Sequence, residues 1–192
     1  MARDGAVHKQ ASGNGRPAAR PRPLDRTRLD ELALAYVARF ATSAAKLERY
    51  LRRKLRERGW EGEDEPDPGA LVERFVELGY VDDRAFAQTR SGSLLRRGYG
   101  PRRIGQALGQ AGIAEDIRED VRPDESARRD AALAIARKRR FGPFGSTPLD
   151  RPQREKQIAA LLRAGHMLAD ARALIDAPSE DAAQRWAAES ED

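Results

Sequence analysis

The most distinctive chemistry in this sequence lies in clusters of arginine and lysine side chains. After Ser43 one stretch holds seven cations and two acids, and residues 96–103 hold four arginines around a glycine-rich turn. A guanidinium group donates two parallel hydrogen bonds to a phosphate or a carboxylate. The clusters therefore predict a surface for phosphates or for a groove lined with acidic groups. Their residues are Lys46, Arg49, Arg52, Arg53, Lys54, Arg56 and Arg58, and Arg96, Arg97, Arg102 and Arg103.

A third cluster of the same sign occupies residues 137–140. If the segments that carry the three clusters stack side by side, the cations form one basic stripe. The alternative is an ordinary solvated helix face, although such a face usually mixes charges of both signs. We select seven arginines as the candidate contact surface for a partner or a nucleic acid: Arg52, Arg53, Arg56, Arg96, Arg97, Arg102 and Arg103.

The sequence does not indicate catalysis or metal binding. The chain has no cysteine, and its two histidines, His8 and His166, do not both lie in the expected folded body, so no histidine pair there can share a metal. Asp82 and Asp83 precede an expected helix, where capping explains them better than acid–base chemistry. The turn Gly98-Tyr99-Gly100-Pro101 lacks the Gly-Lys-Ser/Thr ending of a phosphate-binding loop. We therefore predict no catalytic residue, no metal, no cofactor and no enzyme.

The elements that position these clusters are helices that repeat along the chain. Three leucines lie 53 residues apart, and each belongs to an amphipathic segment that stops four residues later at a glycine. A repeated helical unit of this size cannot bury its apolar stripe alone, so neighbouring units must stack. The leucines and their glycines are Leu55 and Gly59, Leu108 and Gly112, and Leu161 and Gly165.

The resulting fold prediction is an all-α, elongated array of three tandem three-helix repeats with a disordered N-terminal tail. No convincing period-two alternation occurs, so no sheet is expected. Helix starts are predicted at Thr42 or Ser43, at Asp82 or Asp83, and at Pro178-Ser179. The predicted domains are 1–25 (basic tail), 26–81, 82–123 and 124–177 (repeats), and 178–192 (acidic tail with a short helix).

Composition limits the class of protein. The 192 residues carry a net charge of +5 and a pI of about 9.9, which favours nucleic acid or an acidic partner. No apolar stretch approaches the 18 or so residues of a membrane span, and the N-terminus has no apolar segment typical of a secretory signal. The basic N-terminal tail is either a solubilising extension or a non-specific nucleic-acid arm.

Three groups of sequence segments, which occur in the same order as in the family, resemble the RecX family of recombinase regulators. The resemblance covers about residues 29–175. It departs from the family pattern at Gln157, where an apolar residue is expected by analogy with Leu51 and Ile104, and at His166, which replaces an aromatic or aliphatic residue after glycine. The segments are Leu51-Arg52-Arg53-Lys54-Leu55 with Gly59-Trp60, Leu78-Gly79-Tyr80-Val81-Asp82-Asp83 with Phe86-Ala87, and Arg96-Arg97-Gly98-Tyr99-Gly100-Pro101-Arg102-Arg103-Ile104 with Gly112-Ile113.

This resemblance implies a non-enzymatic regulator that binds the RecA filament on single-stranded DNA. It implies inhibition of ATP hydrolysis, strand exchange and the filament-stimulated self-cleavage of repressors, with roles in homologous recombination, DNA repair and the SOS response. A cytoplasmic monomer is expected. The alternative is a helical regulator that binds single- or double-stranded DNA, or RNA, without a recombinase, and that shows a steep dependence on salt.

Overall fold

The structure is a computed structural model that describes residues 22–189. The predictions for the basic tail up to residue 21 and for residues 190–192 lie outside this range. Within it the chain forms α-helices and one short 3-10 helix, with no β-strand; Leu24 and Trp60 make an isolated bridge. The elements are α1 (Arg26–Arg39), α2 (Ala44–Arg58), α3 (Pro68–Glu77), α4 (Asp83–Arg96), α5 (Pro101–Gln110), α6 (Glu115–Asp120), α7 (Glu125–Arg139), η1 (Gly142–Phe144), α8 (Arg151–Arg163), α9 (Leu168–Ile175) and α10 (Glu180–Ala188).

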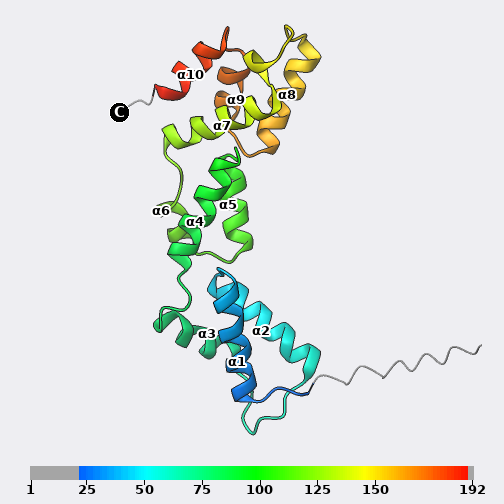
Figure 1. Ribbon diagram of the computed structural model, residues 1–192, viewed down its shortest axis with the longest axis vertical. Coiled ribbons are helices and arrows are strands. Elements are labelled where there is room, and N and C mark those ends of the chain that lie inside the picture. The colour runs from blue at the N-terminus through cyan, green and yellow to red at the C-terminus, as the bar shows by residue number, and fades with distance from the viewer. Residues whose placement is uncertain (1–21, 190–192) are drawn as a thin grey trace, which may run out of the picture.

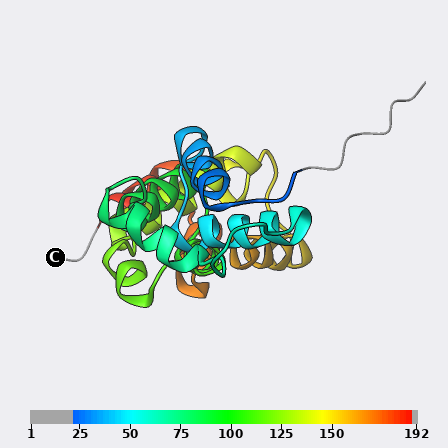
Figure 2. The ribbon, with the colours of Figure 1, turned by 90° about the horizontal axis from the view of Figure 1, so that it is seen from below.

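The helices follow one another along the long axis of the molecule in three groups (Figure 1). Seen along that axis, the groups lie over one another (Figure 2). The predicted all-α, elongated array of three helical repeats is therefore confirmed. We call the groups α1–α3, α4–α6 and α7–α9 modules 1, 2 and 3. No helix among residues 22–189 is both long enough and apolar enough to cross a membrane.

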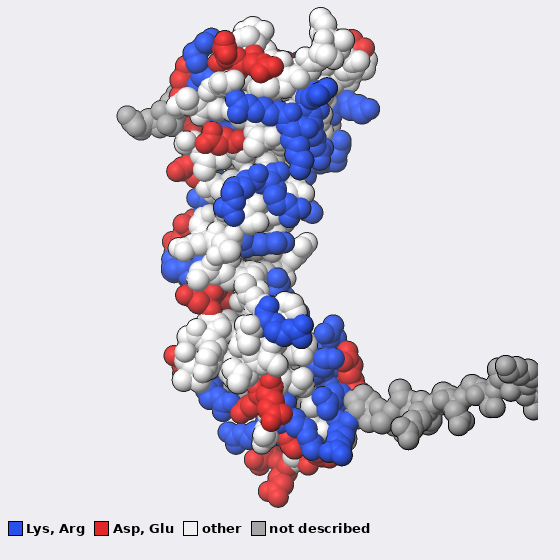
Figure 3. Space-filling model, in the orientation of Figure 1, with Lys and Arg blue, Asp and Glu red and all other residues white. Residues whose placement is uncertain are grey.

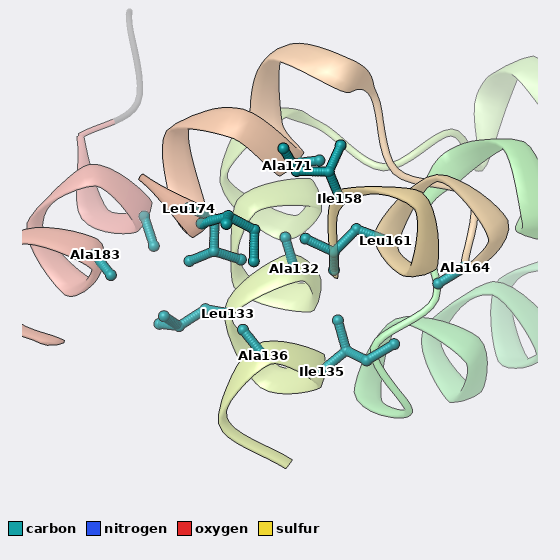
Figure 4. Close-up of a cluster of buried hydrophobic side chains, with 12 residues drawn as sticks. Ala132, Leu133, Ile135, Ala136, Ile158, Leu161, Ala164, Ala171, Leu174 and Ala183 are labelled. Atoms are coloured by element: carbon teal, nitrogen blue, oxygen red, sulfur yellow. The ribbon is translucent and has the colours of Figure 1, made fainter. Parts of the chain in front are cut away.

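Each module has its own small apolar core. Of the leucines that repeat every 53 residues, Leu108 and Leu161 are fully buried, and Leu55 is half-buried beside the first core. Figure 4 shows the third core, where side chains from α7, α8 and α9 point toward one another. The later helix α10 covers the outer side of α7 through its buried alanines, Ala183 and Ala187. Trp186 packs against the same core.

Short polar side chains begin most of the helices. Ser43, rather than Thr42, caps α2, and its hydroxyl accepts a hydrogen bond from the backbone N–H of Lys46. Asp82 caps α4 in the same way. Each such cap contributes about 1 kcal/mol to stability. The helix expected after Pro178-Ser179 is present as α10, with Ser179 as its cap.

The second helices of the three modules meet end to end, an arrangement that the sequence did not predict. The N–H of Gly100, at the start of α5, donates to the carbonyl of Ala164, at the end of α8. Likewise the hydroxyl of Ser43, at the start of α2, donates to the carbonyl of Ala111, at the end of α5. The C-terminal carbonyls of one helix thus face the N-terminal end of the next, which aligns the three helix dipoles favourably.

Candidate functional site

The basic clusters lie on elements of all three modules. Figure 3 shows Lys and Arg side chains gathered along one side of the upper and middle parts of the molecule, whereas Asp and Glu lie mainly toward the opposite edge and the lower end. The seven candidate arginines come from α2, the end of α4 and the start of α5. Every one of the seven is exposed. We call these seven residues the basic stripe.

The arginines of module 1 are partly engaged within the chain. Arg52 pairs with Glu48 at 2.7 Å and Arg53 with Glu57 at 3.5 Å, both one helical turn apart on α2. Arg56 forms no ion pair with the described residues. Exposed pairs of this kind contribute only about 0.2–1 kcal/mol. A partner can therefore displace them at a small cost.

The four arginines of module 2 are available without such competition. Arg96, Arg97, Arg102 and Arg103 form no ion pair within residues 22–189. The guanidinium of Arg97 lies over the ring of Tyr99, with 5.4 Å between its carbon and the ring centroid. The turn between α4 and α5 therefore presents four full positive charges, and this is the densest uncompensated part of the stripe.

Two glycines give this turn its shape. Gly98 has a φ of +81°, and a Cβ on it would lie 2.6 Å from the Cβ of Ile135 in module 3. A Cβ on Gly100 would lie 2.4 Å from the carbonyl carbon of Gly165. Only glycine permits such close backbone approach. The turn that presents the arginines is thus also the surface on which module 3 packs.

From module 3, His166 contacts the same turn. Its side chain is fully buried, and Nε2 lies 3.0 Å from the carbonyl oxygen of Gly98. Burial lowers the pKa of His166, against smaller raising effects from the Gly98 carbonyl and from Asp170. The neutral imidazole therefore donates its Nε2–H to the carbonyl oxygen of Gly98. This hydrogen bond joins the arginine turn to module 3. His166 therefore has a packing role at the end of α8.

The two carboxylates before α4 have different roles. Asp82 caps its own helix, as predicted. Asp83 was predicted as an alternative cap for α4; instead its Oδ1 accepts a hydrogen bond, at 2.8 Å, from the backbone N–H of Ala44 in module 1. The carboxylate lies near the start of α2, where the helix dipole favours a negative charge. Both acids thus have structural partners. Among residues 22–189 no group of three or more His, Cys, Asp or Glu side chains is arranged to hold a metal ion.

The sequence predicts a shared stripe for the cations at residues 137–140 and the other two clusters, but not their proximity to cations of α8. The structure places Arg139 and Arg140 beside Lys156 and Arg163 of α8, around one hollow. Two stretches at helix ends are similar: the end of α7 leads into Lys138-Arg139-Arg140-Phe141-Gly142-Pro143, and the end of α4 leads into Arg96-Arg97-Gly98-Tyr99-Gly100-Pro101. The arginine-rich turn is therefore repeated in module 3, with a different continuation.

Comparison with known proteins places these features in a family. A family model described as "RecX, second three-helix domain" matches residues 82–121. Regulatory protein RecX of Myxococcus xanthus (strain DK1622) is 35% identical over 166 residues, or 82% of this chain and 89% of that protein. The RecX of Halorhodospira halophila (strain DSM 244 / SL1) is 35% identical over 136 residues, or 69% and 80%. The crystal structure of RecX from Lactobacillus salivarius has a TM-score of 0.62 and 18% identity, covering 78% of this chain and 94% of that one.

The fold and the stripe define a class of protein: an elongated helical-repeat protein with a basic face. The similarity to the relatives, over most of both chains, is more specific. The chain belongs to the RecX family of regulatory proteins.

Proposed function

We propose that this chain binds the filament that the RecA recombinase forms on single-stranded DNA and mainly inhibits its recombinase, ATPase and coprotease activities. In this role it acts in homologous recombination, DNA repair and the SOS response, as a cytoplasmic monomer without catalytic activity or a cofactor. The basic stripe contacts the filament, which offers phosphates and acidic protein groups.

The observation that carries this proposal is the unpaired state of the module 2 arginines. Four guanidinium groups lie on one short turn, and that turn is fixed against module 3 by backbone hydrogen bonds from Gly100 and Arg102 to Ala164 and Gly165. A preorganised cluster of charges loses little entropy when it binds an anionic surface. The turn is therefore the expected centre of the contact.

The elongated shape supports a contact with several protomers. Three modules in a row present cations at successive positions along the molecule (Figure 3). Each contact is weak alone, but once one module is bound the others act at a high effective concentration. A filament with repeating sites suits such an array better than an isolated globular partner does.

The test is ATP hydrolysis by the recombinase of the same organism on excess single-stranded DNA, with substoichiometric wild-type chain. We expect inhibition. The triple variant Arg96→Ala, Arg102→Ala, Arg103→Ala should require about tenfold more protein, because charge-assisted contacts are lost. The matched control removes three exposed cations outside the stripe, Arg122, Arg172 and Arg185, and should inhibit as the wild type does. Equal inhibition by both triple variants would exclude the basic stripe as the surface that contacts the filament.

The second candidate function is direct binding to nucleic acid without a recombinase. The excess of unpaired cations favours it too. It predicts no effect on ATP hydrolysis together with tight binding to bare DNA, and a logarithmic salt dependence of roughly 0.7–0.9 per phosphate contact. Measuring ATP hydrolysis and DNA binding with the same protein preparation distinguishes the two functions.

A further inference from the structure

A second basic feature lies in module 3, outside the basic stripe. A hollow of about 490 Å³ opens between the C-terminal end of α7, the segment after η1, and one face of α8. Its volume lies within the range of about 300–1,000 Å³ typical of small-ligand sites. Every charged residue that lines it is a cation, and two hydroxyl side chains stand beside them. These lining residues are Arg139, Arg140, Lys156, Arg163, Ser146 and Thr147.

The cations of the hollow are not neutralised by the chain itself. None of the four forms an ion pair with a described carboxylate. Arg154 on the same helix shows the contrast, because it pairs with both Asp176 and Glu155. All four are exposed, so solvent screens their mutual repulsion, and an anion that enters the hollow is attracted by all of them.

The backbone of Arg140 ends α7 in the left-handed conformation that is common at helix C-termini. Its φ is +54°, which makes it the one non-glycine residue of positive φ within residues 22–189. The corresponding position after α4 is Gly98, which adopts the same left-handed region without a Cβ penalty. An L-residue there costs about 1–2 kcal/mol. This helix end places the side chain of Arg140 among the residues that line the hollow.

The segment that walls the hollow is specific to module 3. In module 2, Pro101 begins α5 directly, whereas after Pro143 the chain continues through η1 and a loop before α8 begins at Arg151. The N–H of Gly100 is satisfied by module 3, but the N–H of Gly142 donates to Oε1 of Gln157, at 2.7 Å. This bond explains why Gln157 occupies a position where an apolar residue was expected. The loop then brings Ser146 and Thr147 to the cations.

We propose that this hollow binds a phosphate group of a single-stranded nucleic acid. A phosphodiester offers two charged oxygens to the guanidinium and ammonium groups, and the hydroxyls can donate further hydrogen bonds. The ring of Phe141 lines the same hollow, and cations beside an aromatic ring are typical of single-strand sites. This contact goes beyond the recombinase interaction proposed above and does not depend on it.

The decisive variant is Arg140→Gly, which removes one cation and also relieves the left-handed strain. Binding of fluorescently labelled oligo(dT) is followed by anisotropy at several salt concentrations, without recombinase. We expect about tenfold weaker binding than for the wild type and a logarithmic salt slope shallower by about 0.7. The melting temperature should be no lower than that of the wild type. Arg185→Ala removes an exposed cation from α10 and should leave both the affinity and the slope unchanged.

Free small anions are tested with inorganic phosphate and with adenosine monophosphate, at matched ionic strength. If either raises the melting temperature of the wild type but not of Arg140→Gly, while oligo(dT) does not bind, the hollow takes the phosphate of a small molecule. Equal strand affinity and equal salt slope for the wild type and Arg140→Gly overturn the proposal, whatever the ATPase assay shows. Binding of none of the three probes by the wild type also overturns it.

Discussion

The two junctions between modules occupy equivalent places but use different chemistry. Between modules 2 and 3 the contact is mostly backbone on backbone: Gly100 lies against Gly165, and two N–H···O=C bonds cross the junction. Between modules 1 and 2, side chains make the hydrogen bonds: the hydroxyl of Ser43 and the guanidinium of Arg49 donate to carbonyls at the end of α5. Asp83 accepts the third bond.

The difference predicts which junction yields more easily. A hydrogen bond from a side chain is released by a rotamer change, but a backbone bond between helix ends breaks only when whole helices move apart. Tyr99 also packs against the cores of both modules 2 and 3, whereas the first and second cores share no described residue. We therefore expect modules 2 and 3 to move as one stiff unit and module 1 to be attached to it more softly.

The largest expected effect is at the stiff junction. Gly100→Ala places a Cβ 2.4 Å from the backbone of Gly165, and neither backbone can yield without separating the modules. We expect a loss of about 3 kcal/mol in the free energy of unfolding, measured by urea denaturation. Gly105→Ala in the same helix meets nothing within 4 Å and should raise the stability by about 0.5–1 kcal/mol. Similar losses for both variants would contradict the comparison.

A smaller loss is expected for Gly112→Ala at the softer junction. Its φ is +80°, which costs an alanine about 1–2 kcal/mol, and the new Cβ meets the Cβ of Ala45 at 2.3 Å. Because a side chain is the obstacle, Ala45→Gly should restore part of the loss. A double-mutant cycle measures this coupling. If Ala45→Gly restores nothing, the clash is not the cause and the junction is stiffer than we infer.

Ser43→Ala removes both the cap of α2 and the bond to the Ala111 carbonyl. We expect a loss of about 1–2 kcal/mol, because that carbonyl then has no buried donor. Ser179→Ala removes a cap at α10 that spans no junction, and should cost about 1 kcal/mol or less. The difference between the stability losses of Ser43→Ala and Ser179→Ala measures the contribution of the hydrogen bond from Ser43 to the Ala111 carbonyl. Hydrogen exchange should localise the loosening to the start of α2.

The smallest effect is the pH dependence of the stiff junction. The pKa of His166 is lowered in the folded state, chiefly by burial, so protonation favours the unfolded chain. The stability that the neutral ring provides is present above about pH 6.5, the usual pKa of histidine, and is lost as the pH falls below it. Asp170, which pairs with Arg128 at 3.0 Å, opposes this only in part. His166→Gln retains an N–H donor, and its urea stability should vary less between neutral and mildly acidic pH than that of the wild type.

The sequence was sufficient for the local structure and for the family. Helical spacing, Ser43, Asp82 and the glycines at helix ends predicted elements that the structure contains. The pairing of Arg52 with Glu48 was also visible, as a spacing of four residues on a helix. The total charge of the cluster does not reveal this pairing, because it does not depend on the spacing of the residues. The basic stripe itself stays a prediction.

The junctions were not predictable from local patterns. That Gly100 and Gly165 touch depends on how separate modules are placed, and nothing in either glycine's neighbourhood along the chain encodes its distant partner. The role of Gln157 was not predictable either, because its bond to the N–H of Gly142 joins two segments that lie 15 residues apart in the sequence. Alignment of the turn after α7 with the turn after α4 was the one signal that pointed to it.

Both outer ends of the column formed by α8, α5 and α2 are closed. At the end of α2, the backbone of Leu24 bonds to Gly59 and Glu61. At the start of α8, Asp150 and Gln153 form a reciprocal capping box. A head-to-tail surface left open at both ends would let copies add without limit and build a fibre. Because hydrogen bonds within residues 22–189 occupy both ends, the column offers no open helix end to which a further copy could add.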